Sequence, residues 1–201
     1  CILYTYLAQA HLQCAAGRLE AAHATLDRLG EIAEGIGLDR LQAWRFAEQI
    51  RIACHQHDLA RARELFRRLR ALAMPYLDKR GCAWAEIPLA CAMAHTALAL
   101  AEGDYRCAIE VGESWALVCQ EWGQLQPATV LRIRVAIART ALHEPQEAQR
   151  HMSTALRNAC EYGMFRVFLD EGAAGLRLLQ SLSVDALTAL ERDYIQHCLM
   201  H

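Results

Sequence analysis

The residues best suited to chemistry are cysteines and histidines that fall close together at two places. The stretch CHQHD contains Cys54, His55 and His57, and Cys91 stands four residues before His95. Thiolate and imidazole groups are common zinc ligands. However, the first three positions do not converge well on one face of a helix, and no fourth ligand is evident for them. Cys91 and His95 do share one helix face, but a packed core pair explains them as well. We therefore interpret the first stretch as a helix end and turn and the second as a packed core pair, and we predict no metal site.

Acidic and basic side chains are grouped at two further places. Asp170 and Glu171 are adjacent, but neighbouring residues of a helix point about 100° apart, which argues against paired catalytic carboxylates. The stretch RARELFRRLR at 61–70 carries five arginines, which could contact phosphate. They spread around the predicted helix, so we expect a solvated face opposite a buried stripe of Ala62, Leu65, Phe66 and Leu69. Because no Ser/His/Asp or Cys/His arrangement is legible, we predict that the chain is not an enzyme.

Composition limits the remaining classes of function. The 201 residues include 21 Lys and Arg and 23 Asp and Glu, a net charge of −2, whereas a nucleic-acid surface normally needs dense positive charge. The uncharged run at 87–101 is shorter than the roughly 20 residues of a membrane helix. The nine cysteines are odd in number and include no CxxC pair, which predicts buried, reduced thiols in a cytoplasmic protein. We therefore expect neither direct nucleic-acid contact nor membrane contact.

We predict that these side chains lie on helices and that a unit of two helices repeats along the chain. Ala, Leu, Glu, Gln and Arg dominate, and no alternation typical of strands is sustained. A turn followed by a small residue recurs at Ala22, Ala62, Ala108 and Ala148, a spacing longer than that of the usual tetratricopeptide unit. We predict an all-α fold, a right-handed superhelix of about five tetratricopeptide-like hairpins in one domain, 1–201. The predicted hairpins are 2–35, 38–74, 86–123, 126–163 and 165–199.

Glycine marks the predicted ends of three helices, in EGIGL (34–38), EWGQL (121–125) and EYGMF (161–165). At these places we predict left-handed caps, which glycine forms at low cost. The final helix is predicted to begin at Ser183 as its N-cap, with Asp185 near the positive end of the helix dipole.

The segment 161–182 reads as one helix, although it contains Gly172 and Gly175. A glycine inside a helix costs about 1 kcal/mol relative to alanine. We expect closer packing against a neighbouring helix to offset this cost.

In the same segment, YGMFRVFLDEGAAGLRLL resembles a stretch of the large ATP-dependent LuxR-type transcription regulators, the MalT-like regulators. The matching residues are Gly163, Arg166, Phe168, Leu169, Asp170, Glu171, Gly172, Leu178 and Leu179. The long repeats also resemble the superhelical domain of that family. The resemblance implies a domain that senses an effector and takes part in self-association, so a homo-oligomer is also expected.

Members of that family also carry an ATPase domain and a helix-turn-helix domain. This chain has no GxxxxGK[ST] motif, and its only lysine, Lys79, stands in the unrelated stretch YLDKRG. We expect the chain to be a fragment of a larger regulator that itself binds no cofactor, neither ATP nor DNA.

The predicted binding surface is the concave face of the superhelix, lined by the first helix of each hairpin. The repeat phase places there Tyr4, His11, Trp44, Arg51, His55, Met93 and Ile133. Aromatic and apolar side chains with a few polar groups suit a small-molecule effector. Two alternatives stay open: these residues simply pack against adjacent repeats, or the chain is a tetratricopeptide-like adaptor that binds a partner protein and no small molecule.

Overall fold

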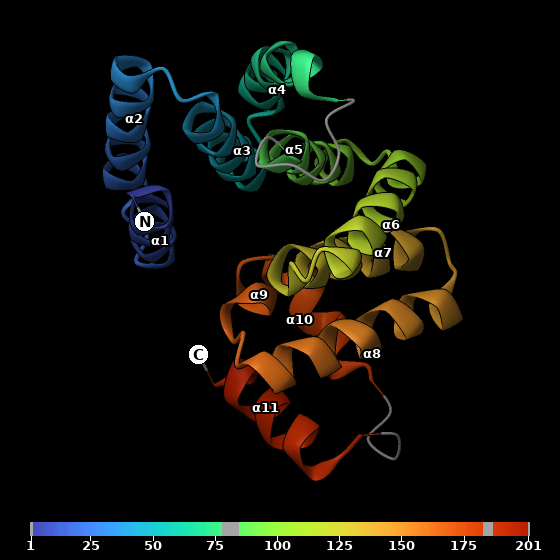
Figure 1. Ribbon diagram of the computed structural model, residues 1–201. Helices are drawn as coiled ribbons and strands as arrows, with labels where there is room; N and C mark the ends of the chain where they lie inside the picture. The colour runs from blue at the N-terminus through green and yellow to red at the C-terminus, as the bar shows by residue number, and fades with distance from the viewer. Residues whose placement is uncertain (1, 78–84, 183–186, 201) are drawn as a thin grey trace. The chain divides into compact units, whose positions relative to one another are not determined.

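The computed structural model describes residues 2–77, 85–182 and 187–200, and every regular element within these ranges is a helix (Figure 1). This confirms the all-α prediction. The longer helices are α1 (Ile2–Ala15), α2 (Leu19–Ile36), α3 (Asp39–His55), α4 (Leu59–Ala73), α5 (Glu86–Glu102), α6 (Tyr105–Glu121), α7 (Leu125–Ala141) and α8 (Pro145–Tyr162). The short 3-10 helix η1 (Met74–Tyr76) follows α4. The superhelical arrangement of hairpins stays a prediction.

The chain divides into two compact units, Cys1–Glu102 and Gly103–His201. The boundary lies between α5 and α6, inside the predicted hairpin 86–123. In the first unit α2 contacts α1 and α3, and α3 also contacts α4 and α5. In the second unit α7 contacts α6, α8 and two short helices described below, α9 and α10. Each unit thus has a central helix, α3 or α7, and the organisation of the whole chain as one repeat domain stays a prediction.

Each core combines aliphatic side chains with small residues that let helices approach closely. The fully buried large side chains include Leu26, Leu29, Leu41, Ile50, Leu69 and Ile87 in the first unit, and Leu131, Ile133, Met152 and Phe168 in the second. The four alanines of the sequence repeat are buried as well: Ala22, Ala62, Ala108 and Ala148. In interiors packed this densely, a larger side chain at these positions would force the helices apart.

Short turns with a left-handed residue join the helices. A positive φ recurs at equal intervals within each of two series, at Gly17, Gly37 and His57 and again at Gly103, Gly123, His143 and Gly163. The predicted left-handed glycines are confirmed, with φ of 65° at Gly37, 69° at Gly123 and 64° at Gly163. One helix and one turn therefore make a step of constant length, and two such steps make one repeat of the sequence.

The prediction of a single helix at 161–182 is wrong. After α8 ends at Tyr162, the segment forms two short helices, α9 (Arg166–Leu169) and α10 (Gly172–Gln180). Gly172 has a φ of 70°, a left-handed conformation that interrupts the helix and that glycine adopts at little cost. At Gly175 an added Cβ would lie 3.3 Å from the Cβ of Glu171 in the same segment and 3.5 Å from Ile133 of the neighbouring helix α7.

The last helix, α11 (Ala189–Leu199), begins later than predicted. Its N-cap is Thr188, which forms a capping box with Glu191. Ser183 and Asp185, the predicted N-cap and dipole partner, lie outside the described residues. The Tyr194 hydroxyl donates a hydrogen bond of 2.8 Å to the Met164 carbonyl, which holds α11 against the turn that follows α8.

Candidate functional site

Two of the residues predicted to bind a ligand meet at one buried carboxylate in the first unit. His11 on α1 lies with Nε2 3.1 Å from Oε2 of Glu48 on α3. Arg51, one turn further along α3, donates from Nε to both Glu48 oxygens at 3.0 Å. The Glu48 side chain is 8% exposed, against 13% for Arg51 and 27% for His11. We call these three residues the Glu48 cluster.

The repeat explains why the Glu48 cluster forms. His11 and Arg51 lie one full repeat apart, so they occupy the same position on successive first helices. Because α1 contacts α3, both side chains reach the carboxylate of Glu48. Glu48 itself stands at the i, i+3 spacing to Arg51 that brings side chains together on one helix face. Sequence reasoning found the two basic partners and missed the acid between them, although this spacing was a usable signal.

The Glu48 carboxyl is ionised in spite of its burial. Burial alone would raise its pKa, but the charge of Arg51 and hydrogen bonds from His11 and Arg51 outweigh burial and hold the pKa far below the ordinary value. A carboxylate only accepts, so His11 donates from Nε2. The cluster therefore fixes the orientation of an imidazole and a guanidinium, which suits recognition of oxygen acceptors and supplies no nucleophile.

Polar contacts join α2 to α3 beside the Glu48 cluster. Asp27 accepts a hydrogen bond of 3.0 Å from Gln49, the residue after Glu48, and lies 3.8 Å from Arg45. Gly30 makes room for Arg45, since a Cβ at position 30 would collide with its guanidinium. Burial lowers the pKa of Arg45. These contacts fix the face of α3 that carries Glu48.

The other predicted binding residues occupy varied surroundings. Tyr4 on α1 is 67% exposed, and His55, the last residue of α3, is exposed. Trp44 is half-buried against two core clusters, and Met93 is half-buried on α5, where its carbonyl accepts from Thr96. Ile133 is fully buried in the second unit, next to Gly175, and is not accessible to a ligand.

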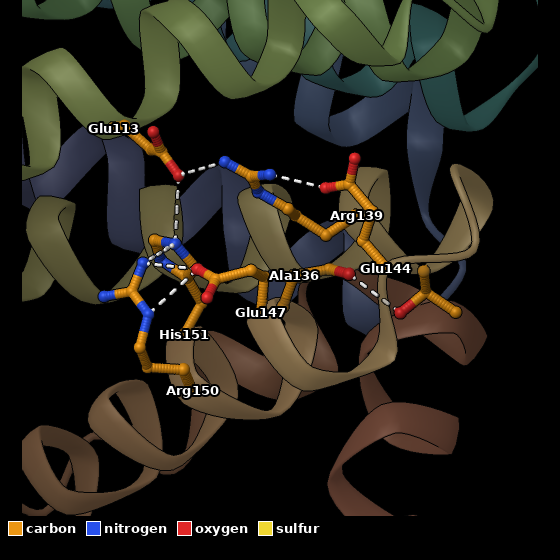
Figure 2. Close-up of polar contacts among 8 residues, drawn as sticks. Glu113, Ala136, Arg139, Glu144, Glu147, Arg150 and His151 are labelled. Carbon is orange, nitrogen blue, oxygen red and sulfur yellow. Dashed lines mark hydrogen bonds and ion pairs between the residues drawn. The ribbon is translucent and has the colours of Figure 1, made fainter.

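The second unit contains a larger polar cluster around Glu113 of α6 (Figure 2). Arg139 of α7 donates to Glu113 at 2.9 Å and also bonds Glu144, at the start of α8. His151 of α8 lies with Nε2 3.1 Å from the same Glu113 oxygen. Arg150, the fifth member of this Glu113 cluster, lies 3.1 Å from His151. No spacing in the sequence points to these contacts, which join residues up to 38 positions apart.

His151 is a neutral, buried histidine. Its side chain is 4% exposed, and burial, followed by the charge of Arg150, lowers its pKa. Nε2 lies 3.1 Å from Glu113, which only accepts, and 3.1 Å from Arg150, which only donates, so a neutral ring satisfies one of these two contacts at a time. The other ring nitrogen, Nδ1, is buried and has no hydrogen-bond partner among the described residues. A proton on Nδ1 would therefore lack an acceptor, which agrees with the lowered pKa.

The residues that carry the family resemblance make structural contacts. Glu171 accepts two hydrogen bonds, at 2.8 and 2.9 Å, from Arg134 of α7, and both side chains are buried. Asp170 pairs with Arg166 at 2.6 Å. Asp170 and Glu171 thus serve separate ion pairs. The turn between α9 and α10 is held to α7 by the buried pair.

The arginine-rich stretch 61–70 has the predicted exposed arginines, whereas Phe66 of the predicted buried stripe is only half-buried. Its five arginines are exposed on α4, while Ala62, Leu65 and Leu69 are buried. Arg67 pairs with Glu64 on the same helix, and Arg63 pairs with Glu102 at the end of α5. Exposed ion pairs of this kind add little stability.

The CHQHD stretch forms the predicted helix end and turn, whereas Cys91 and His95, the predicted core pair, are both half-buried. α3 ends at His55, His57 is the left-handed residue of the turn, and Asp58 caps α4. His95 stacks on Phe66 with ring centroids 4.8 Å apart, and burial raises the pKa of Cys91 to about 11. Among residues 2–77, 85–182 and 187–200, no three Cys, His, Asp or Glu side chains are grouped as a metal site would require.

Comparison of the chain with protein-family models, with curated proteins and with solved structures finds no match. In the described ranges, none of the helices has the length and apolar content needed to cross a bilayer. The function proposed below therefore rests on the geometry of the Glu48 cluster and on the resemblance noted in the sequence.

Proposed function

We propose that the chain is the effector-sensing and self-association domain of a MalT-like, LuxR-type transcriptional regulator and that it binds a small molecule at the Glu48 cluster. The observation that carries the proposal is the convergence of His11 and Arg51 on one buried carboxylate. Both residues belong to the face that the repeat phase assigns to ligand binding. The resemblance of YGMFRVFLDEGAAGLRLL to the regulator family supports the sensing role.

The chemistry of the cluster suits a ligand with oxygen acceptors. Glu48 neutralises Arg51 and orients its guanidinium, so the site recognises acceptors without the cost of an unpaired buried charge. Trp44, half-buried on the same helix, adds an apolar surface. Binding would shift the chain between a resting and a self-associating form, to the extent that the two forms differ in affinity for the effector.

A partner-binding adaptor is the second candidate. It is favoured by the apolar side chains that α1 exposes, among them Ile2 (45%), Tyr4 (67%) and Leu12 (59%). Such residues suit a partner helix or peptide more than a small polar molecule.

The experiment that separates the two candidates measures thermal stability of the chain with a panel of polar metabolites. A sensing domain should show saturable stabilisation by one class of metabolite, by about 2.7 kcal/mol at one hundred times Kd. His11→Gln keeps a donor for Glu48 and should weaken the affinity for the metabolite about tenfold. The matched control His23→Gln, on α2, should leave the effect unchanged.

The result against sensing would be no stabilisation by any metabolite, together with a partner peptide that protects α1 from exchange. The regulator assignment is tested separately by sequencing the gene on both sides of the region that encodes this chain. A phosphate-loop ATPase encoded upstream and a helix-turn-helix encoded downstream are expected, and the absence of both would remove the regulator proposal while leaving the binding site open.

A further inference from the structure

Arg132 on α7 is a buried guanidinium with no acidic hydrogen-bond partner in the part of the chain that the structure describes. The residue is 9% exposed. One terminal nitrogen donates to the amide oxygen of Gln120 on α6 at 2.7 Å, and Nε has no acceptor among the described residues. A buried charge is normally paired with an opposite charge, because losing its hydration is costly. Arg132 is therefore an anomaly that the fold alone does not explain.

Two further basic groups, Arg150 and His151, lie 3.1 Å apart on α8, which packs against the helix of Arg132. After burial, the charge of Arg150 on α8 lowers the pKa of Arg132 most, and Glu113 opposes it with a smaller effect. Arg150 and Arg132 both lower the pKa of His151. His151, 4% exposed, has the unpartnered Nδ1 described above. Three basic side chains from two adjacent helices thus share one small region of the second unit.

The acidic groups around this region contact Arg139, Arg150 and His151, and among the described residues none of them bonds Arg132. Arg139 donates hydrogen bonds to both Glu113, from α6, and Glu144 (Figure 2). Glu147 accepts a hydrogen bond of 2.7 Å from Arg150. Within the described residues, Arg139 therefore bonds two carboxylates while Arg132 bonds none. An anion from solution would supply the missing partner.

We propose that the face formed by α6, α7 and α8 binds a small anion, a carboxylate or a phosphate group, through Arg132 and Arg150, with His151 protonated in the bound state. The flat fork of a guanidinium matches both classes of anion. Arg150, whose side chain is 59% exposed, is the point of entry from solvent. The bound anion offsets the positive charge of Arg150 and Arg132, which adds to the effect of burial in keeping His151 neutral in the free protein. This proposal does not rest on the regulator assignment or on the Glu48 cluster.

The test is calorimetric titration of the whole chain with sulfate and with oxalate. Both probes keep their charge between about pH 6 and pH 8, so any pH effect belongs to the protein. We expect saturable binding that is about tenfold tighter at the lower pH, with proton uptake. The tighter of the two probes assigns the class, sulfate for a phosphate group and oxalate for a carboxylate.

Three variants complete the experiment. Arg132→Met removes the charge and keeps the length, so it should weaken binding at least about tenfold while the free protein stays as stable or becomes more stable. His151→Gln should keep binding and lose its pH dependence. Arg157→Met, at an exposed position on α8, is the matched control and should bind as the wild type does. The proposal is overturned if the wild type binds neither probe saturably, or if Arg132→Met binds as tightly as wild type.

Discussion

Each unit contains a histidine in contact with a glutamate that also pairs with an arginine. The two clusters differ in whether the glutamate or the histidine is the buried partner. In the first unit the acid is buried, with Glu48 at 8% and His11 at 27% exposure. In the second unit the base is buried, with His151 at 4% and Glu113 at 35%. Burial disfavours charge in both, but Arg51 keeps Glu48 ionised, whereas Arg150 and Arg132 add to the effect of burial on His151. The sign of the neighbouring charge thus decides which buried group stays charged.

The largest effect is expected when the charge that keeps Glu48 ionised is removed. Arg51→Met leaves a buried carboxylate without its guanidinium, and we expect a loss of about 3 to 5 kcal/mol in the free energy of unfolding, measured by urea titration. The double variant Arg51→Met with Glu48→Met should recover most of that loss. Equal destabilisation by the single and double variants would show that packing, and not the unpaired charge, sets the cost.

A smaller effect is expected at the glycine that accommodates Arg45. By the repeat, Gly30 and Arg45 correspond to Ala116 and Leu131 in the second unit. Gly30→Ala should cost about 1 kcal/mol, because the overpacking of Arg45 exceeds the gain in helix propensity.

Adding Arg45→Leu reproduces the pair found in the second unit and should remove most of the cost of Gly30→Ala. The measurement is a double-mutant cycle on the free energy of unfolding. Additive effects would mean that Arg45 moves aside freely and that the two positions are not coupled.

The smallest effects are expected in how stability depends on pH. The two clusters should differ in the pH range over which each one loses its contribution. The lowered pKa of His151 means that its contribution to stability is full above the ordinary value of 6.5 and is lost as pH falls below it. Because the pKa of Glu48 is lowered, its contribution to stability is lost only at a lower pH, below the ordinary value of 4.5.

The measurement is the urea midpoint as a function of pH. His151→Gln should flatten the decline between about pH 7 and pH 5, and Glu48→Gln should flatten only the decline below about pH 4.5. If His151→Gln leaves the slope between those values unchanged, His151 is not held neutral by its surroundings.

Local signals predicted the helices, their left-handed glycine turns and the buried alanines, because each depends on residues within one or two turns of the chain. The same signals misjudged Gly172, since a glycine that breaks a helix and one that packs inside it, such as Gly175, look identical in sequence. Thr188 was missed because its capping box depends on where α11 begins. Glu48 was recoverable from its spacing to Arg51, whereas the Glu113 cluster joins three helices through contacts that follow no period.

The equal spacing of the left-handed turns has a consequence for how such a chain can change in length. A gain or loss of one full repeat between equivalent turns, for example from Gly103 to His143, returns every later helix to the same rotational phase. A change of any other size would rotate buried positions toward solvent. Natural variants of this chain should therefore differ by whole pairs of helices, with smaller insertions confined to the connections between them.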